Sequence, residues 1–180
     1  MQHIAYQSYQ MKYTTLSKTN DNVVVESPLQ ININNNPYTV VMRTPGDDYD
    51  LVRGLLYAED IYKKKEEFNF TIVKKEKKVN EIVNVTISKC DLGSGYLNKR
   101  TLLSVSSCGI CGKTKLSDLH VSGDKISSTF LFSLNDLEQM QAEMVKHQQT
   151  FKQTGGCHAA AVFNRDSELL VTKEDIGRHN

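Results

Sequence analysis

The stretch SLNDLEQMQAEMVKHQQTFKQTGGCHAAAVFNRDSELLVT, residues 133–172, decides the fold class of this chain. Its opening, Ser-Leu-Asn-Asp at 133–136, has the pattern of a helix capping box, and apolar residues follow at helical spacing. Two short apolar runs, 159–163 and 169–172, then flank a turn-forming Asn-Arg-Asp-Ser sequence, as paired strands do. A helix followed by a strand pair predicts an α+β, or mixed α/β, fold.

The N-terminal half of the chain is richer in β-favouring runs. Three of them, 23–26, 29–33 and 38–42, are separated by proline and asparagine turns, and two more follow at 70–73 and 79–87. Between these groups a Pro-Gly-Asp turn precedes a helical pattern. The apolar face of that helix is formed by Leu51, Val52, Leu55, Leu56 and Ala58. This half is therefore expected to form a small β-rich subdomain with one helix.

We expect the chain to divide into three parts. Residues 1–22 are polar and lack a sustained apolar period, which predicts a loosely ordered N-terminus. Residues 23–95 form the β-rich subdomain, and the Gly-Ser-Gly sequence at 93–95 is interpreted as a flexible joint at its end. Residues 96–180 then form the α/β core, which carries a pair of cysteines.

Charge and hydropathy exclude several classes of function. The chain has 22 basic and 21 acidic residues, so its totals show no electrostatic footprint for nucleic acid or for an anionic membrane. No apolar run reaches the length of a transmembrane helix, and the N-terminal residues lack the charged and apolar regions of a signal peptide. We therefore expect a cytoplasmic protein whose 4 cysteines are reduced rather than paired in disulfides.

The sequence Cys-Gly-Ile-Cys-Gly-Lys at 108–113 is the most informative motif for chemistry. Its glycines leave backbone N–H groups open, and these groups and the lysine favour the thiolate forms of Cys108 and Cys111. A thiolate attacks sulfur–sulfur bonds, so the pair could accept a sulfane sulfur as a persulfide. The spacing alone leaves three alternatives open: a zinc site completed by Cys157 or His158, a dithiol redox pair, or core packing.

Two further segments carry candidate site residues. In a Thr-Gly-Gly-Cys-His sequence, Gly155 and Gly156 allow the main chain to approach a ligand closely, and His158 could contact that ligand. A tight turn, with a histidine bonded within the fold, is the alternative explanation. In the final Glu-Asp-Ile-Gly-Arg-His-Asn sequence, Arg178 could hold a phosphate and Asp175 could accept from a guanine edge or a sugar hydroxyl. The start of a helix would use the same residue types.

Four segments together resemble the FdhD/NarQ family. They occur in the family's order and span nearly the whole chain from about residue 23 onward. The segments are Arg-Thr-Pro-Gly-Asp-Asp at 43–48, Ser-Ser-Cys-Gly-Ile-Cys-Gly-Lys at 106–113, Thr-Gly-Gly-Cys-His-Ala-Ala-Ala at 154–161 and Glu-Asp-Ile-Gly-Arg-His-Asn at 174–180. The resemblance implies a homodimer in which each chain has a small N-terminal β-rich unit and a core similar to the cytidine deaminase fold.

The resemblance also implies a function. It implies a sulfur carrier, or sulfurtransferase, that takes persulfide sulfur from a cysteine desulfurase and passes it to the molybdenum bis(guanine dinucleotide) cofactor for formate dehydrogenase. By this similarity Cys108 carries the persulfide and Cys111 is its partner, whereas the candidate residues of the glycine-histidine and final segments contact the guanine nucleotide moiety. The cofactor is then a client, and no permanently bound metal is expected.

Family members continue beyond the Arg-His-Asn at which this sequence ends. The resemblance therefore implies that the core is incomplete at its C-terminus. Two alternatives to the sulfur carrier are a zinc-stabilised binding module, built on the same two cysteines, and an inactive fragment of the carrier.

Overall fold

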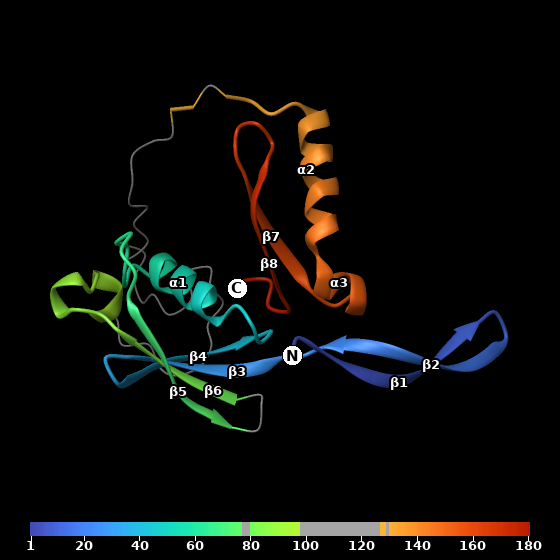
Figure 1. Cartoon of the computed structure of the whole chain (residues 1–180), viewed down its shortest axis with the longest axis horizontal. Helices are drawn as coiled ribbons and strands as arrows, with labels where there is room; N and C mark the ends of the chain where they lie inside the picture. The colour runs from blue at the N-terminus through green and yellow to red at the C-terminus, as the bar shows by residue number, and fades with distance from the viewer. Residues whose placement is uncertain (77–79, 98–126, 129) are drawn as a thin grey trace, which may run out of the picture. The chain divides into compact units, whose positions relative to one another are not determined.

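A computed structural model describes residues 1–76, 80–97, 127–128 and 130–180 (Figure 1). Its contacts gather into two units. Among the described residues, one unit contains Met1, residues 25–76 and 80–97, and residues 179–180. The other contains residues 2–24, 127–128 and 130–178. The division predicted near residue 95 stays a prediction, because residues 98–126 lie outside the described part of the chain.

The first unit is built on a four-stranded sheet of order β4-β3-β6-β5. β3 (Ser27–Ile33) lies parallel to β6 (Asn80–Thr86), and each has an antiparallel neighbour on its other side. These neighbours are β4 (Asn36–Arg43) and β5 (Asn69–Glu76), and helix α1 (Asp48–Ala58) follows β4. The last four predicted β-runs and the predicted helix of this half are therefore confirmed.

The core of the first unit lies between the sheet and α1. Burial alternates along β3, as expected for a strand with one face inside the protein. The fully buried apolar residues include Leu29, Ile31, Ile33, Val83 and Val85 from the sheet and Val52 and Leu56 from α1. Each such side chain contributes about 1.5–3 kcal/mol, so this cluster holds α1 on the sheet. Two 3-10 turns, η1 (Lys89–Asp91) and η2 (Ser94–Leu97), follow β6.

The glycines of the predicted flexible joint are fixed against the end of α1, so that prediction is wrong. The backbone N–H of Gly93 donates to Ile61 O at 2.8 Å, and that of Gly95 donates to Asp60 O at 3.0 Å. A Cβ atom at Gly93 would overlap the carbonyl oxygen of Asp60, and one at Gly95 would overlap that of Glu59. The two glycines therefore serve close backbone packing rather than flexibility.

The second unit contains two hairpins and two helices. Its antiparallel pairs are β1 (His3–Lys12) with β2 (Thr15–Val24), and β7 (His158–Phe163) with β8 (Leu169–Asp175). Helices α2 (Leu134–His147) and α3 (Gln149–Thr154) precede β7. The helix and strand pair that indicated the fold class are both present, and the α+β class is confirmed.

The N-terminal residues form paired strands rather than the loosely ordered end predicted for 1–22. The register of β1 and β2 runs from His3 opposite Val24 to Lys12 opposite Thr15, around a turn in which Tyr13 has a φ of 55°. Tyrosine and threonine favour strands, but polar residues on both faces hide the two-residue period by which a strand is recognised.

Helix α2 begins as its capping box predicts. Ser133 Oγ accepts from the backbone N–H of Asp136 at 3.1 Å, and Asp136 Oδ2 accepts from that of Ser133 at 2.8 Å. Its apolar side is less buried than the helical spacing suggests, because Met140 is 9% exposed whereas Leu134 and Leu137 are 73% and 50% exposed. The spacing therefore predicts the helix better than it predicts its packing.

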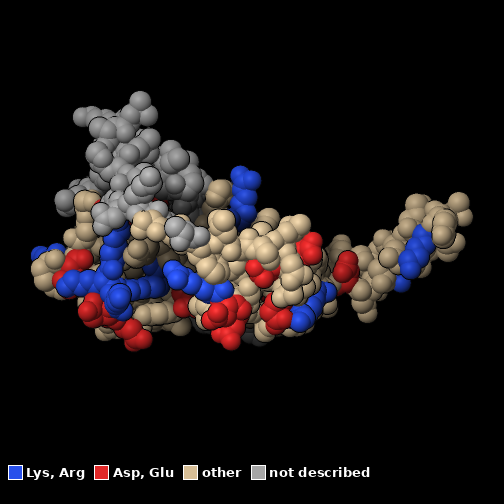
Figure 2. Space-filling model, turned by 90° about the horizontal axis from the view of Figure 1, so that it is seen from above, with Lys and Arg blue, Asp and Glu red and all other residues tan. Residues whose placement is uncertain are grey.

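Basic and acidic side chains lie next to each other on the face shown in Figure 2. On the first unit, Lys63 pairs with Asp60 at 2.9 Å and Lys64 pairs with Asp91 at 2.6 Å. Such pairing fits the balanced charge of the sequence. None of the helices among the described residues is long and apolar enough to cross a membrane.

Candidate functional site

The predicted catalytic residues, Cys108 and Cys111, lie outside the described residues. The structure instead describes the other segments of the family resemblance. Residues 43–48 belong to the first unit, and residues 154–161 and 174–178 belong to the second. The second unit therefore contains all the candidate nucleotide contacts.

The glycine pair terminates α3 and begins the approach to β7. Gly155 has a left-handed φ of 65°, and its N–H donates to Phe151 O at 2.7 Å, which closes the end of the helix. Gly156 donates to Thr154 Oγ1 at 3.2 Å, and a Cβ atom there would lie 3.2 Å from Val24 Cγ1 of β2. Gly155 thus has a conformational role and Gly156 packs closely on β2, so the tight-turn explanation is sufficient for both.

Glu174, which the sequence analysis did not single out, joins the final segment to the helix that precedes the glycine pair. The Glu174 carboxylate of β8 accepts from the backbone N–H groups of Thr150 and Phe151, each at 2.8 Å. It therefore caps the first turn of α3 and replaces the side-chain cap that Gln148 does not supply. Thr150 also donates to Gln2 Oε1 at 3.0 Å, which ties the same turn to the N-terminal residues.

His158 and Asp175 face each other at the open end of the β7–β8 hairpin. They are register partners, and directly opposed residues of an antiparallel pair project from the same face of the sheet. His158 is exposed, and Asp175 Oδ1 accepts from the N–H of Gly177 at 2.7 Å. Arg178 follows closely and is also exposed. The structure therefore brings the His158 imidazole and the Asp175 carboxylate together, and the Arg178 guanidinium follows Asp175 closely in the sequence.

The 43–48 segment has a structural role in the first unit. Arg43 is fully buried; its Nε lies 2.6 Å from Asp48 Oδ1 and its Nη2 lies 3.1 Å from Glu81 Oε2. Its Nη1 donates to Ser27 Oγ. Burial raises the pKa of Asp48 and outweighs the hydrogen bond from Arg43, which lowers it. This ion cluster joins β3, β4, β6 and the start of α1 from within.

The metal alternative is tested only in part. Cys157 is a buried cysteine directly before β7, and Cys90 is an exposed one after β6. In the described ranges, no three His, Cys, Asp or Glu side chains are grouped as ligands of one metal ion. Because Cys108 and Cys111 lie outside those ranges, a zinc site that includes them stays a hypothesis.

Comparisons with known proteins agree with the motif pattern. Residues 24–180 match the model of the FdhD/NarQ family. The sulfur carrier protein FdhD of Mycobacterium tuberculosis is 34% identical over 175 residues, an alignment that covers 89% of this chain and 62% of that protein. The sulfur carrier protein FdhD of Picrophilus torridus is 36% identical over 171 residues, covering 89% of this chain and 60% of that protein.

The fold of the chain also has a solved counterpart. The crystal structure of a candidate formate dehydrogenase accessory protein from Desulfotalea psychrophila has a TM-score of 0.64 and 18% identity, covering 99% of this chain and 64% of that one. This likeness bears on the fold alone. The chain spans about three fifths of the length of the curated relatives it matches. Because the family match extends over residues 24–180, the chain belongs to the FdhD/NarQ family.

Proposed function

We propose that this chain is a sulfur carrier that serves formate dehydrogenase, with Cys108 as the residue that receives the sulfur. The observation that carries the proposal is the family match over residues 24–180, which includes both Cys108 and Cys111. The curated relatives are named sulfur carrier proteins, and their aligned regions cover 89% of this chain. The donor is a cysteine desulfurase, and the client is the molybdenum bis(guanine dinucleotide) cofactor.

The transfer needs no external oxidant. The Cys108 thiolate attacks the outer sulfur of the donor's cysteine persulfide, the sulfur–sulfur bond of the donor breaks, and the donor leaves as a thiolate. Cys108 then carries the persulfide. Attack by the Cys111 thiolate on the inner sulfur releases hydrosulfide to the client and leaves a disulfide, which a thiol reductant returns to the dithiol. The first step is therefore a sulfur transfer between two cysteine thiols, and the second releases the sulfur as hydrosulfide.

The second unit supplies candidate contacts for the client's nucleotide. A carboxylate such as that of Asp175 can accept from the N–H groups of a guanine edge, and the Arg178 guanidinium can bind one phosphate through two parallel hydrogen bonds. His158 projects from the same face of the β7–β8 hairpin as Asp175. Gly155 and Gly156 form the tight turn that leads into β7. We assign these five residues to the nucleotide side of the proposed site.

Mass spectrometry of the intact chain tests the proposal. The chain is incubated with a cysteine desulfurase and cysteine, and we expect one added sulfur that a thiol reductant removes. Cys108→Ala should abolish the addition, whereas Cys90→Ala, at an exposed cysteine outside the 108–113 motif, should leave it unchanged. Retention of sulfur by Cys108→Ala would refute the assignment.

Stoichiometric zinc, with unfolding on chelation, would support the zinc-stabilised module instead. A folded, metal-free chain that takes up no sulfur would support the inactive fragment.

A further inference from the structure

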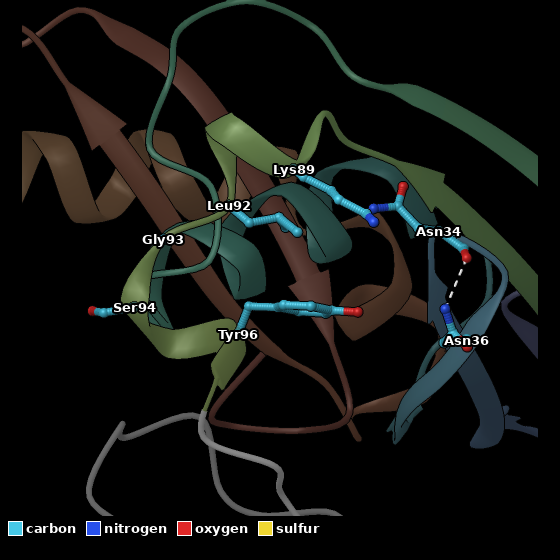
Figure 3. A pocket seen from close by; sticks show the side chains of 7 residues that line it. All are labelled: Asn34, Asn36, Lys89, Leu92, Gly93, Ser94 and Tyr96. Atoms are coloured by element: carbon cyan, nitrogen blue, oxygen red, sulfur yellow. Dashed lines mark hydrogen bonds between the residues drawn. The ribbon is translucent and has the colours of Figure 1, made fainter.

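The first unit contains a cavity that the proposed function does not use. Its volume is about 420 Å³, and it lies between the β3–β4 turn and the segment from η1 to η2 (Figure 3). The side chains that line it belong to Asn34, Asn36, Lys89, Leu92, Ser94 and Tyr96. This volume is within the range of small-molecule sites, about 300–1,000 Å³.

One wall of the cavity is held in place by Asn34, whose side-chain amide bonds to the backbone of Ile87 as the backbone of a neighbouring strand would. Its Nδ2 donates to Ile87 O at 2.8 Å and its Oδ1 accepts from the N–H of Ile87 at 2.9 Å. The backbone N–H of Asn34 donates to Val85 O at 2.8 Å. Asn36 Nδ2 donates to Asn34 O at 3.0 Å, which directs the second amide of the turn along the same wall. The turn is thereby fixed to the end of β6.

The opposite wall is held by the end of α1. Ser94 Oγ donates to Asp60 Oδ2 at 2.6 Å, and Gly93 bonds to the same chain segment through its backbone. The ring of Tyr96 is stacked on Tyr38, with ring centres 6.3 Å apart and 25° between the planes. Figure 3 shows the Leu92 and Tyr96 side chains projecting into the same space. The cavity therefore has a preformed surface of one aromatic and one aliphatic side chain.

Lys89 adds a positive charge to this surface. Two other lysines of the first unit, Lys63 and Lys64, are paired with Asp60 and Asp91. Lys89 forms no ion pair within the part of the chain that the structure describes. An ammonium group without a carboxylate partner, beside an apolar slot, is a recognition element for an anion.

We propose that this cavity binds a small planar aromatic anion. The ring of the ligand packs between Leu92 and Tyr96, its negative group lies at Lys89, and the Asn36 amide provides a hydrogen bond. Aromatic contacts contribute about 0.5–1.5 kcal/mol beyond burial, and a partly exposed ion pair contributes less than about 1 kcal/mol. The site is independent of the sulfur-carrier function, because it uses neither Cys108 nor Cys111.

NMR titration of the ¹⁵N-labelled chain tests the proposal with defined probes. 2-Naphthoate and 1-naphthyl phosphate carry both the ring and the charge, and they distinguish a carboxylate from a phosphate. 2-Naphthalenemethanol has the ring alone, and inorganic phosphate has the charge alone. We expect saturable shifts of the Asn36, Leu92 and Ser94 amides with at least one of the two aromatic anions. Both single-feature probes should bind at least about threefold more weakly.

Three variants separate the contributions of ring and charge. Lys89→Gln should weaken the aromatic anion about threefold to fivefold, and Tyr96→Leu should weaken it about threefold to tenfold. Tyr96→Phe retains the ring and should bind as the parent does, which separates loss of the ring from loss of folding. Lys18→Gln, on the β1–β2 hairpin of the other unit, is the charge control and should have no effect. Absence of saturable shifts would overturn the proposal. It would also be overturned by equal binding of a single-feature probe, or by unchanged affinity in Lys89→Gln or Tyr96→Leu.

Discussion

Replacing the buried Arg43 by methionine should destabilise the first unit by about 3 kcal/mol at neutral pH. The arginine is fully buried, and its acidic partners Asp48 and Glu81 have only 16% and 6% of their side chains exposed. Methionine keeps the aliphatic volume but leaves two carboxylates without their cation, which costs about 3–5 kcal/mol for buried pairs. The lower value applies because Asp48 keeps some contact with water.

The assay is urea unfolding, followed through the NMR signals of core residues Leu29 and Val83, which report on the first unit alone. Arg53→Met is the matched control, since Arg53 on α1 binds the backbone oxygens of Glu66 and Lys64 from a partly exposed position. It should cost about 1 kcal/mol or less. Equal losses for the two arginines would refute the reasoning.

The pH dependence of the Arg43→Met deficit provides a second check. The pKa of Asp48 is already raised above its ordinary value of 3.8 by burial, and loss of the guanidinium should raise it further. A carboxyl with a raised pKa favours folding most below its ordinary pKa, and this contribution is lost as the pH rises through the folded-state value. The deficit should therefore be smallest below pH 3.8 and grow toward neutrality. A constant deficit would show that charge is not its cause.

Three further changes test other contacts. Gly95→Ala should destabilise the first unit by about 1–3 kcal/mol because the added Cβ would overlap the backbone carbonyl of Glu59. Gly54→Ala, in an open part of α1, should stabilise the unit by up to about 1 kcal/mol. Urea unfolding midpoints measure both changes. Glu174→Ala should cost about 1 kcal/mol and speed hydrogen exchange at the first turn of α3, and unchanged exchange would contradict the cap. The hydrogen bond from Lys64 lowers the pKa of Asp91 below its ordinary value of 3.8. The pair therefore stabilises the folded state above pH 3.8, and this contribution is lost as the pH falls through the lowered pKa. In Lys64→Gln the NMR titration of Asp91 should move back toward 3.8.

The sequence predicts those elements that have one buried face. Leu29, Ile31 and Ile33 alternate with polar residues because β3 lies between solvent and a core, so the pattern is visible without the structure. The β1–β2 hairpin has no such face, and Tyr9 lies opposite Lys18 there. Its formation depends on pairing and on the turn, which hydropathy does not report.

The candidate site was predictable in its residue types but not in its connections. The Gly155 turn follows from glycine's access to positive φ, and the structure confirms it. That Glu174 caps α3 depends on a contact with residues more than twenty positions earlier in the chain, which no local pattern encodes. The opposition of His158 and Asp175 likewise depends on the register of β7 and β8.

Burial separates the motif residues that shape the fold from those that could touch a client. Arg43 is fully buried and Glu174 uses its carboxylate on α3, so substitutions there should lower activity only through the folded fraction. His158 and Arg178 are exposed, and a client could reach them without any rearrangement of the core. Under the proposed sulfur-carrier function, substitutions at these two positions should therefore change sulfur delivery more than they change stability.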